Sequence, residues 1–219
     1  MTGEGGMGGA ERTVLVTGGT TRIGKAIADA LRAAGWRVIT SSHRADSGAD
    51  IVADLAEPLG AAKLYSECLR MLGGNPPDAL VNNAALFVGD DATLETVNLE
   101  APRKLTTLMA GRETGRGAVV NILDCRVLGG GEPRGAYERA KRGLLADTKK
   151  YAALFADTIR VNAVAPGPVL APEGVSEKAG EMPLGRPRPE DVARAVVFLL
   201  EANATTGCII PVDGGQSLL

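Results

Sequence analysis

Histidine, cysteine and long apolar runs are scarce in this chain of 219 residues. Its single histidine, His43, excludes a multi-histidine metal site and a serine–histidine catalytic triad. The three cysteines lie far apart without metal-ligand spacing, so we expect free thiols in a reducing cytoplasm. No apolar run approaches the ~18–20 residues of a membrane span. The net charge of −2 gives no electrostatic footprint for nucleic acid or an anionic membrane. We therefore expect no metal, nucleic-acid or membrane partner.

The composition favours one folded domain behind a short tail. Hydrophobic residues make up 45% of the chain, which is enough for one α/β domain with a sizeable core. Residues 1–11 are rich in glycine and lack an apolar stretch, so we expect a disordered tail and no secretory signal. The folded domain is then expected over 12–219.

Short apolar runs alternate with segments of helical periodicity. The expected strands are 12–17, 36–41, 50–54, 79–82, 118–123, 159–164 and 208–212. The expected helices are 23–34, 58–72, 94–111, 135–154 and 189–202. This alternation predicts a single-domain α/β fold, a Rossmann-type doubly wound parallel sheet of about seven strands with helices on both faces. The segment 42–49 is too short for a full crossover helix and is expected to be one helical turn or a bare loop.

A glycine-rich turn, Val-Thr-Gly-Gly-Thr-Thr-Arg-Ile-Gly at 16–24, follows the first expected strand. A strand, a glycine turn and a helix start together let backbone N–H groups and the helix dipole face a pyrophosphate. The end of the second strand, at 40–44, contains no acid to hold ribose hydroxyls. His43, Arg44 and Arg22 could instead meet a 2′-phosphate, which favours NADPH as cofactor. Arg44 could also be a solvated loop charge.

Tyr137 and Lys141 lie four residues apart and share one face of the expected helix. The lysine charge is expected to lower the pKa of the phenol and make it a proton donor. Asp124 lies thirteen residues upstream. An ionised aspartate would repel negative charge on a carbonyl oxygen and raise the pKa of Tyr137, so it suits ketone reduction poorly unless it is protonated. A C=N bond, by contrast, needs a proton on nitrogen, which a carboxyl group can deliver directly or through Tyr137 and water.

Jointly, these motifs resemble those of the short-chain dehydrogenase/reductase family, over nearly the whole of 12–219. The matching segments are Thr-Gly-x-x-x-Arg-Ile-Gly at 17–24, Asp54-Leu55, Asn-Asn-Ala at 82–84, Asn98, Tyr137-x-x-x-Lys141, Pro166-Gly167 and Val-Asp-Gly-Gly at 212–215. The glycine turn, the basic groups above and the resemblance together give the expected cofactor contacts: Gly18, Thr21, Arg22, Ile23, His43, Arg44, Asp54, Leu55, Asn83, Ala84, Tyr137, Lys141, Pro166, Gly167 and Val169. The resemblance also implies that Lys141 binds the nicotinamide ribose and that Asn98 holds a water in a proton relay.

Two departures from the family pattern narrow the resemblance. The family usually has glycine at the position of Arg22 and serine at that of Asp124, and both changes resemble the pteridine reductase branch, which includes dihydromonapterin reductase. Phe87 falls where those enzymes stack a pterin ring, although by itself it could be a core aromatic. The expected reaction is hydride transfer from NADPH to a pterin or dihydrofolate C=N bond, with the proton from Asp124 and Tyr137. Arg22 is expected to contact both the cofactor phosphate and the polar edge of the pterin.

Other interpretations stay open. The chain could be an NADPH-dependent carbonyl reductase of the 3-oxoacyl thioester type, or a protein that binds NADPH without chemistry. The proline-containing loop at about 165–189 is expected to close over the substrate, or to be a plain surface connection. The family also implies a homotetramer or homodimer built through the helices at 94–111 and 135–154. Four residues there could make the contact or be buried within the subunit: Ala101, Leu105, Leu108 and Met109.

Overall fold

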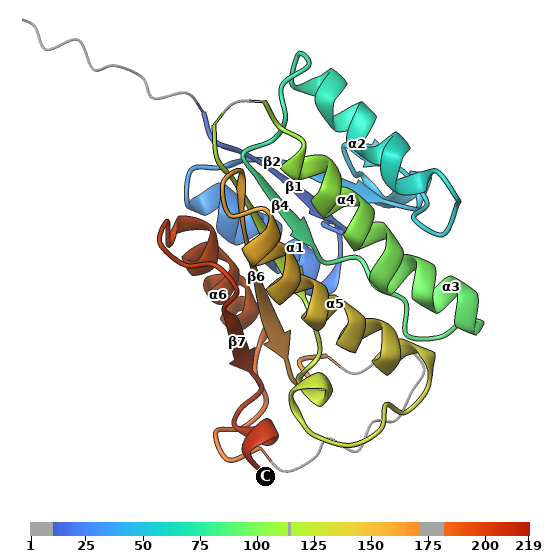
Figure 1. The fold of residues 1–219 in the computed structure, drawn as a ribbon, viewed down its shortest axis with the longest axis vertical. Coiled ribbons are helices and arrows are strands. Elements are labelled where there is room, and N and C mark those ends of the chain that lie inside the picture. Colours follow the sequence, from blue (N-terminus) through green and yellow to red (C-terminus); the bar gives the residue numbers. More distant parts are fainter. Residues whose placement is uncertain (1–10, 114, 171–181) are drawn as a thin grey trace, which may run out of the picture.

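A parallel sheet of seven strands forms the centre of the molecule (Figure 1). The computed structural model describes residues 11–113, 115–170 and 182–219. The strands run in the spatial order β3-β2-β1-β4-β5-β6-β7 and all neighbours pair in parallel. Their bounds are β1 Thr13–Thr17, β2 Arg37–Ser42, β3 Ile51–Val52, β4 Ala79–Asn82, β5 Gly117–Ile122, β6 Ile159–Pro166 and β7 Ile209–Val212. The predicted doubly wound sheet is confirmed.

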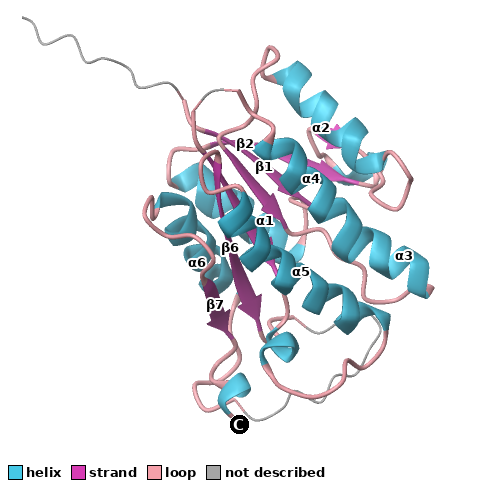
Figure 2. Ribbon diagram, in the orientation of Figure 1, coloured by secondary structure: helices cyan, strands magenta, loops and turns pink. Residues whose placement is uncertain are grey.

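Helices cover both faces of the sheet (Figure 2). One layer contains α1 (Arg22–Ala33) and α6 (Pro189–Glu201), and the other contains α2 (Gly60–Met71), α4 (Ala101–Ala110) and α5 (Ala136–Leu154). The buried strand β1 serves both layers, because successive side chains of a strand point to opposite faces. Val14 and Val16 pack with α1 and α6, whereas Leu15 packs with α2 and α4.

The expected helix at 94–111 begins earlier and is not a uniform α-helix. Asp90 caps its start by accepting a hydrogen bond from the N–H of Thr93 at 2.9 Å, so α3 spans Asp91–Glu95. A π-helical turn follows at Thr96–Glu100 and leads directly into α4. Pro102 contributes to this irregularity, because it has no N–H to offer the carbonyl of residue 98. The sequence analysis missed both features.

Chain order reverses between β1 and β4, which are adjacent although two strands separate them in sequence. In such sheets a crevice forms outside the carboxyl ends of the strands at the point of reversal. The glycine turn follows β1 and Asn83 follows β4, so both lie at this edge. The short connection after β2 contains one helical turn, η1 at Ala45–Ser47, as expected.

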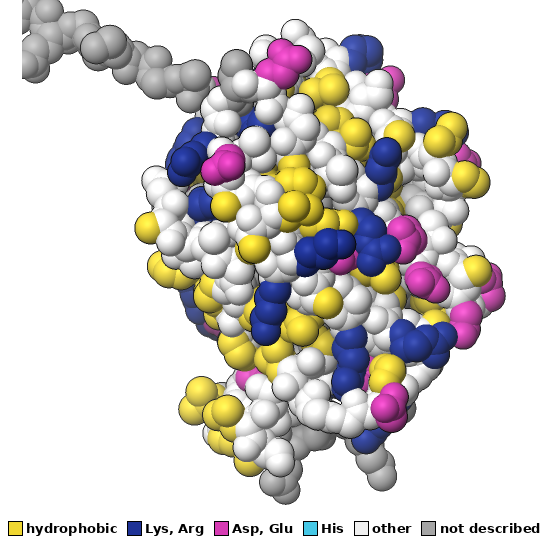
Figure 3. Space-filling view, viewed as in Figure 1, with side chains coloured by type: hydrophobic (Ala, Val, Ile, Leu, Met, Phe, Trp, Pro, Cys, Tyr) yellow, Lys and Arg dark blue, Asp and Glu magenta, His cyan; other side chains and the backbone are white. Residues whose placement is uncertain are grey.

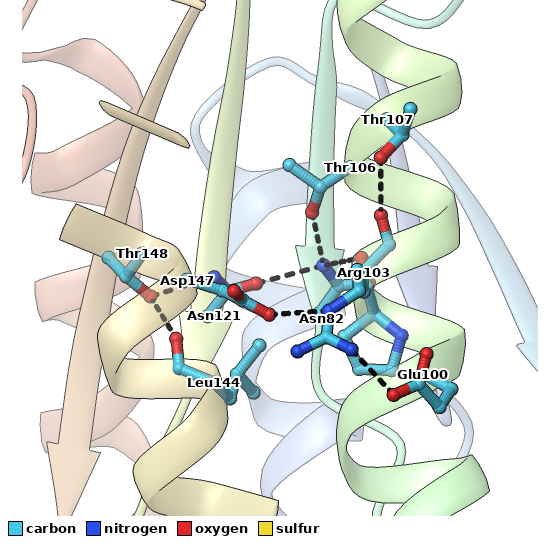
Figure 4. A network of polar contacts seen from close by, with 10 residues as sticks. Asn82, Glu100, Arg103, Thr106, Thr107, Asn121, Leu144, Asp147 and Thr148 are labelled. Atoms are coloured by element: carbon cyan, nitrogen blue, oxygen red, sulfur yellow. Dashed lines mark hydrogen bonds and ion pairs between the residues drawn. The ribbon is translucent and has the colours of Figure 1, made fainter. Parts of the chain in front are cut away.

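A buried polar network ties the helical layer to the sheet (Figure 4). The side-chain amide of Asn82 on β4 donates to Asn121 on β5 and to Thr106 on α4, at 2.9 and 3.3 Å. Asn121 in turn donates to Thr148 on α5 at 2.9 Å. These bonds cross-link two strands and two helices in a low-dielectric interior, where hydrogen bonds between side chains are strong. The network therefore helps to hold α5, the helix that carries Tyr137, in a fixed position.

The outer face of α4 and α5 bears on the expected subunit contact. Ala101, Leu105 and Met109 are buried in the core, so they are not available to a partner. Leu108 is partly exposed. Figure 3 shows hydrophobic side chains interspersed with lysine and arginine over these helices. Of the four residues considered from the sequence, only Leu108 remains a contact candidate.

Candidate active site

The turn after β1 has no room for side chains at its glycines. Gly18 has a φ of +61°, which favours glycine. A Cβ on Gly24 would lie 2.0 Å from the carbonyl oxygen of Gly18 and 2.5 Å from Nδ2 of Asn83. The Asn83 amide donates to the carbonyls of Thr17 and Gly18, at 2.9 and 3.1 Å. The turn is thus closed by the side chain of the residue that follows the neighbouring strand, β4.

The start of α1 offers donors to an anion. Thr21 at the N-cap makes no side-chain capping bond, so the first N–H groups of the helix lack that internal partner. Arg22 follows with a φ of +52°, the only non-glycine residue with positive φ in the described chain. This conformation costs roughly 1–2 kcal/mol for a residue with a Cβ. This strain is a physical reason why the family usually has glycine at the position of Arg22. Arg22 Nη2 also donates to the carbonyl of Leu170 at 3.4 Å.

The groups expected at a 2′-phosphate lie beyond the end of β2. Arg44 is paired through two bonds with Asp46, at 3.1 and 3.0 Å, a partner that the sequence analysis missed. Both side chains are exposed, and exposed ion pairs contribute little to stability, so a phosphate can replace Asp46. His43 and Asp54 line a cavity of about 440 Å³ between β3 and α2. Leu55 beside it is buried.

β6 ends at the same carboxyl edge of the sheet, two strands away from β4. Gly167 packs against Asp213, and a Cβ there would lie 2.8 Å from the Asp213 Cα. Pro166 ends β6, and Val169 is buried in the core. The middle of the loop expected to act as a lid, 171–181, lies outside the described residues, as do residues 1–10 of the expected tail.

Asp124, Arg126 and Tyr137 form one connected group. Asp124 follows β5 and caps the short turn η3 (Cys125–Leu128), accepting from the N–H of Arg126 at 3.0 Å. The Arg126 guanidinium donates two hydrogen bonds to the same carboxylate, from Nε at 3.0 Å and from Nη2 at 2.7 Å. Tyr137, on the first turn of α5, donates its hydroxyl to Asp124 Oδ2 at 3.3 Å. The fold thus brings Asp124 and Tyr137 into contact, and it adds Arg126.

Phe87 packs against the ring of Tyr137. Its ring lies edge-on to that of Tyr137, with 5.0 Å between centroids. The Arg126 guanidinium lies over both rings, 5.3 and 5.5 Å from their centroids. Phe87 is 44% exposed, so it is not a core aromatic, and the exposed Val88 follows it. The result is an exposed, partly apolar surface next to the Tyr137 hydroxyl that is bonded to Asp124.

Lys141 lies behind the tyrosine ring and is almost fully buried. Its Nζ donates to the carbonyl of Ile122 at 2.8 Å and lies 5.9 Å from the Tyr137 ring centroid. Burial lowers the pKa of Lys141 to about 8, although Asp124 opposes the change. Burial also raises the pKa of Tyr137, and the Asp124 carboxylate adds to that rise. The expectation that Lys141 would lower the pKa of Tyr137 is therefore wrong for this structure, because burial and Asp124 dominate.

The protonation of Asp124 also differs from the expectation. Burial raises its pKa, but the hydrogen-bonded ion pair with Arg126 more than offsets this and keeps the pKa below its ordinary value. Asp124 is consequently a carboxylate near neutral pH and not a carboxyl donor. The sequence analysis missed Arg126, although a basic residue two positions after an acidic cap was a visible signal.

Asn98 lies in the π-helical turn and is fully buried. Its side-chain amide donates to the carbonyls of Leu86 and Leu94, at 2.8 and 2.9 Å, and its Oδ1 accepts from the N–H of Leu86 at 3.2 Å. The side chain is therefore committed to fixing the loop that carries Phe87. The role of Asn98 in a water relay stays a prediction.

Because Lys141 is buried, we expect its replacement to raise the free energy of unfolding by an amount that depends on pH. A pKa lowered from 10.5 to about 8 corresponds to roughly 3 kcal/mol of instability while the lysine is charged. Because the unfolded chain binds the proton more tightly, wild-type stability should rise through pH 8–10.5. The stability of Lys141→Met minus that of wild type should thus fall by about 2 kcal/mol between pH 7 and 10, measured by urea unfolding. Lys149→Met, at an exposed lysine of α5, should show no such change, and parallel curves for Lys141→Met would contradict the prediction.

No group of three or more His, Cys, Asp or Glu in the described residues is arranged to hold a metal ion. No helix in the same residues is long and apolar enough to cross a membrane.

Several known proteins are similar to this chain. A family model described as enoyl-(acyl carrier protein) reductase matches residues 76–217. An uncharacterized short-chain type dehydrogenase/reductase of Sinorhizobium fredii is 35% identical over 93% of the chain, which spans 43% of that protein's length. A putative ketoacyl reductase of granaticin polyketide synthesis from Streptomyces violaceoruber is 32% identical, covering 94% of this chain and 96% of that one.

Among solved structures, FolM alternative dihydrofolate reductase 1 from Brucella canis, complexed with NADP, is 33% identical with a TM-score of 0.81 and 95% coverage of both chains. The similarity to this solved structure agrees with the fold described above. The chain belongs to the short-chain dehydrogenase/reductase family.

Proposed function

We propose that this protein is an NADPH-dependent reductase that transfers a hydride to a C=N bond of a pterin, such as a dihydropterin or dihydrofolate. The observation that carries the proposal is the hydrogen bond between Tyr137 and the carboxylate of Asp124, where the family usually has serine. The exposed ring of Phe87 adds a flat surface suited to an aromatic bicyclic substrate. The similar FolM structure, described as an alternative dihydrofolate reductase with NADP, supports the same class.

The carboxyl edge between β1 and β4 fits a dinucleotide. The uncapped start of α1 provides N–H donors for a pyrophosphate, and the backbone at Gly18 and Gly24 leaves no space that a side chain could fill. Arg22, His43 and Arg44 are the groups proposed to meet a 2′-phosphate, which is why we favour NADPH. When bound, NADPH supplies the hydride.

The electrostatics at Asp124 disfavour a carbonyl substrate. Reduction of a ketone develops negative charge on oxygen, which needs hydrogen-bond donors and is repelled by a nearby carboxylate. Reduction of a C=N bond instead makes nitrogen more basic until it is protonated. A C=N nitrogen, unlike a carbonyl oxygen, is basic enough to take up its proton before the hydride arrives, and an ionised Asp124 stabilises the iminium cation that results. The sign of this one charge therefore favours an imine over a ketone.

Tyr137 is the proposed immediate proton donor, because its raised pKa keeps the phenol protonated. Leaving a phenolate beside Asp124 would be costly, so the proton has to be replaced. Lys141, with a pKa of about 8, is the buried acid behind the ring that can restore it. Asp124 orients the hydroxyl as its hydrogen-bond acceptor. We retain the cofactor contact proposed for Lys141 and the lid role proposed for the loop at 165–189.

A carbonyl reductase of the 3-oxoacyl thioester type is the second candidate, favoured by the relative described as a ketoacyl reductase. Purified protein should therefore be assayed for NADPH oxidation with dihydrobiopterin, dihydromonapterin, dihydrofolate and an acetoacetyl thioester. We expect turnover of at least one pterin and little of the thioester. Turnover of the thioester alone would contradict the proposal.

Asp124→Ser is the discriminating variant in the same assay. It is expected to lose at least about tenfold of the pterin turnover and to gain thioester turnover, because it replaces a carboxylate by a hydrogen-bond donor. Asp91→Ser, at an exposed site on α3, is the matched control and should change neither activity. Full pterin turnover by Asp124→Ser would remove Asp124 from the mechanism.

A homodimer or homotetramer and a cytoplasmic location also remain predictions. For assembly, the outer face of α4 and α5 is the proposed contact, with Leu108 at its centre. Sedimentation of the purified protein would test it.

A further inference from the structure

Arg126 makes more contacts in this site than its place in a short turn requires. Its backbone N–H, Nε and Nη2 all donate to Asp124, while its guanidinium lies over the rings of Phe87 and Tyr137. The side chain is nevertheless 47% exposed, so one side of it faces outward. Pairing with Asp124, the cap of η3, does not by itself require the guanidinium to lie over the two rings.

These contacts use the acceptor capacity of Asp124. A carboxylate has about four lone-pair positions, and four donors occupy them here: the three N–H groups of Arg126 and the hydroxyl of Tyr137. Bidentate guanidinium–carboxylate bonds are among the strongest and most directional in proteins. The orientation of Asp124, and with it the direction of the Tyr137 hydroxyl, is therefore set by Arg126.

We propose that Arg126 is a positioning residue of this site, holding the Asp124 carboxylate against the Tyr137 hydroxyl and covering one side of the Phe87–Tyr137 ring pair. This role of Arg126 rests on the proposed function only for the identity of the substrate. Asp124 then acts through Tyr137, and Arg126 determines that it does so as an anion.

The charges around Asp124 show why Arg126 is decisive. In the described part of the chain, the groups that act on it electrostatically are Arg126 and Cys125 on η3 and Tyr137 and Lys141 on α5. Tyr137 is neutral, and burial raises the pKa of the Cys125 thiol to about 12, so it is neutral too. Lys141 is positive but ranks below Arg126 in its effect on Asp124. Without the guanidinium, burial would favour the protonated carboxyl.

Two variants separate charge from geometry. Arg126→Gln removes the positive charge, and Arg126→Lys keeps it while losing the planar two-pronged contact. Protonation of Asp124 is followed in the NADPH-bound protein by infrared difference spectroscopy of the carboxyl C=O band, which Asp124→Asn identifies by its loss. Turnover of the pterin that wild type reduces is measured over the same pH range. Arg139→Gln is the control. Arg139 lies on the same helix as Tyr137, and the substitution breaks its exposed ion pair with Asp91 of α3.

In Arg126→Gln we expect the carboxyl band to appear about 1–3 pH units higher than in wild type, and the acidic limb of kcat to move with it. Arg126→Lys should restore most of the protonation behaviour and less of kcat. The control should match wild type in both, and thermal unfolding should show that each variant folds. An unchanged band and an unchanged pH profile in Arg126→Gln would overturn the inference. If wild type reduces no pterin but the band still moves, the proposed substrate is wrong and the role of Arg126 stands.

Discussion

Replacing Tyr137 by phenylalanine is expected to lower kcat by about 10²–10⁴-fold, because it removes the proposed proton donor and leaves the rest of the site in place. The ring that packs 5.0 Å from Phe87 remains. The lost hydroxyl makes one hydrogen bond within the described residues, to Asp124. Single-turnover oxidation of NADPH by the reducible pterin measures the chemical step, and a fluorescence titration measures the NADPH Kd.

Tyr151→Phe provides the matched control for this prediction. Tyr151 lies on the same helix, is buried and stacks on Phe155 away from Asp124, so its hydroxyl should be dispensable for turnover. Retention of more than about a tenth of kcat by Tyr137→Phe would place proton delivery elsewhere. A loss that appeared equally in NADPH affinity would assign Tyr137 to cofactor binding alone.

Gly24→Ala is expected to weaken NADPH binding by on the order of 100-fold, since the loss of one or two charge-assisted hydrogen bonds of roughly 1.5–3 kcal/mol each has that effect. The new Cβ would lie 2.0 Å from the Gly18 carbonyl oxygen and 2.5 Å from Nδ2 of Asn83. Gly18 belongs to the turn that the cofactor is proposed to meet, and Asn83 holds that turn through its hydrogen bonds. The backbone must therefore move, and the start of α1 moves with it. Isothermal titration with NADPH measures the effect.

Gly111→Ala is the control, because the nearest atom to its Cβ would be 3.5 Å away, an ordinary contact. It should bind NADPH like wild type. Unfolding of both variants in urea shows how much of the Gly24→Ala effect is global. A Gly24→Ala protein that bound NADPH within about threefold of wild type would mean that the turn does not position the cofactor.

The strands and the glycine turn were predictable because their signals are local. A buried parallel strand reads as a continuous apolar run, and the spacing of Tyr137 and Lys141 places both on one face of a helix. The π-helical turn at Thr96–Glu100 was not predictable from helical periodicity, because one extra residue in a turn leaves the apolar pattern almost unchanged. The cap at Asp90 was a local signal that the analysis overlooked.

The sequence by itself determined the fold class, the glycine turn and the pairing of Tyr137 with Lys141, since neighbouring residues specify these. It also supplied Asp124 as the unusual residue, and Arg126 was already two positions away. Only the tertiary structure decided how these groups act on one another. Burial lowers the pKa of Lys141, and burial together with Asp124 raises that of Tyr137, while Arg126 keeps Asp124 ionised. Desolvation depends on what the whole chain packs around a group, and no spacing along the sequence records it.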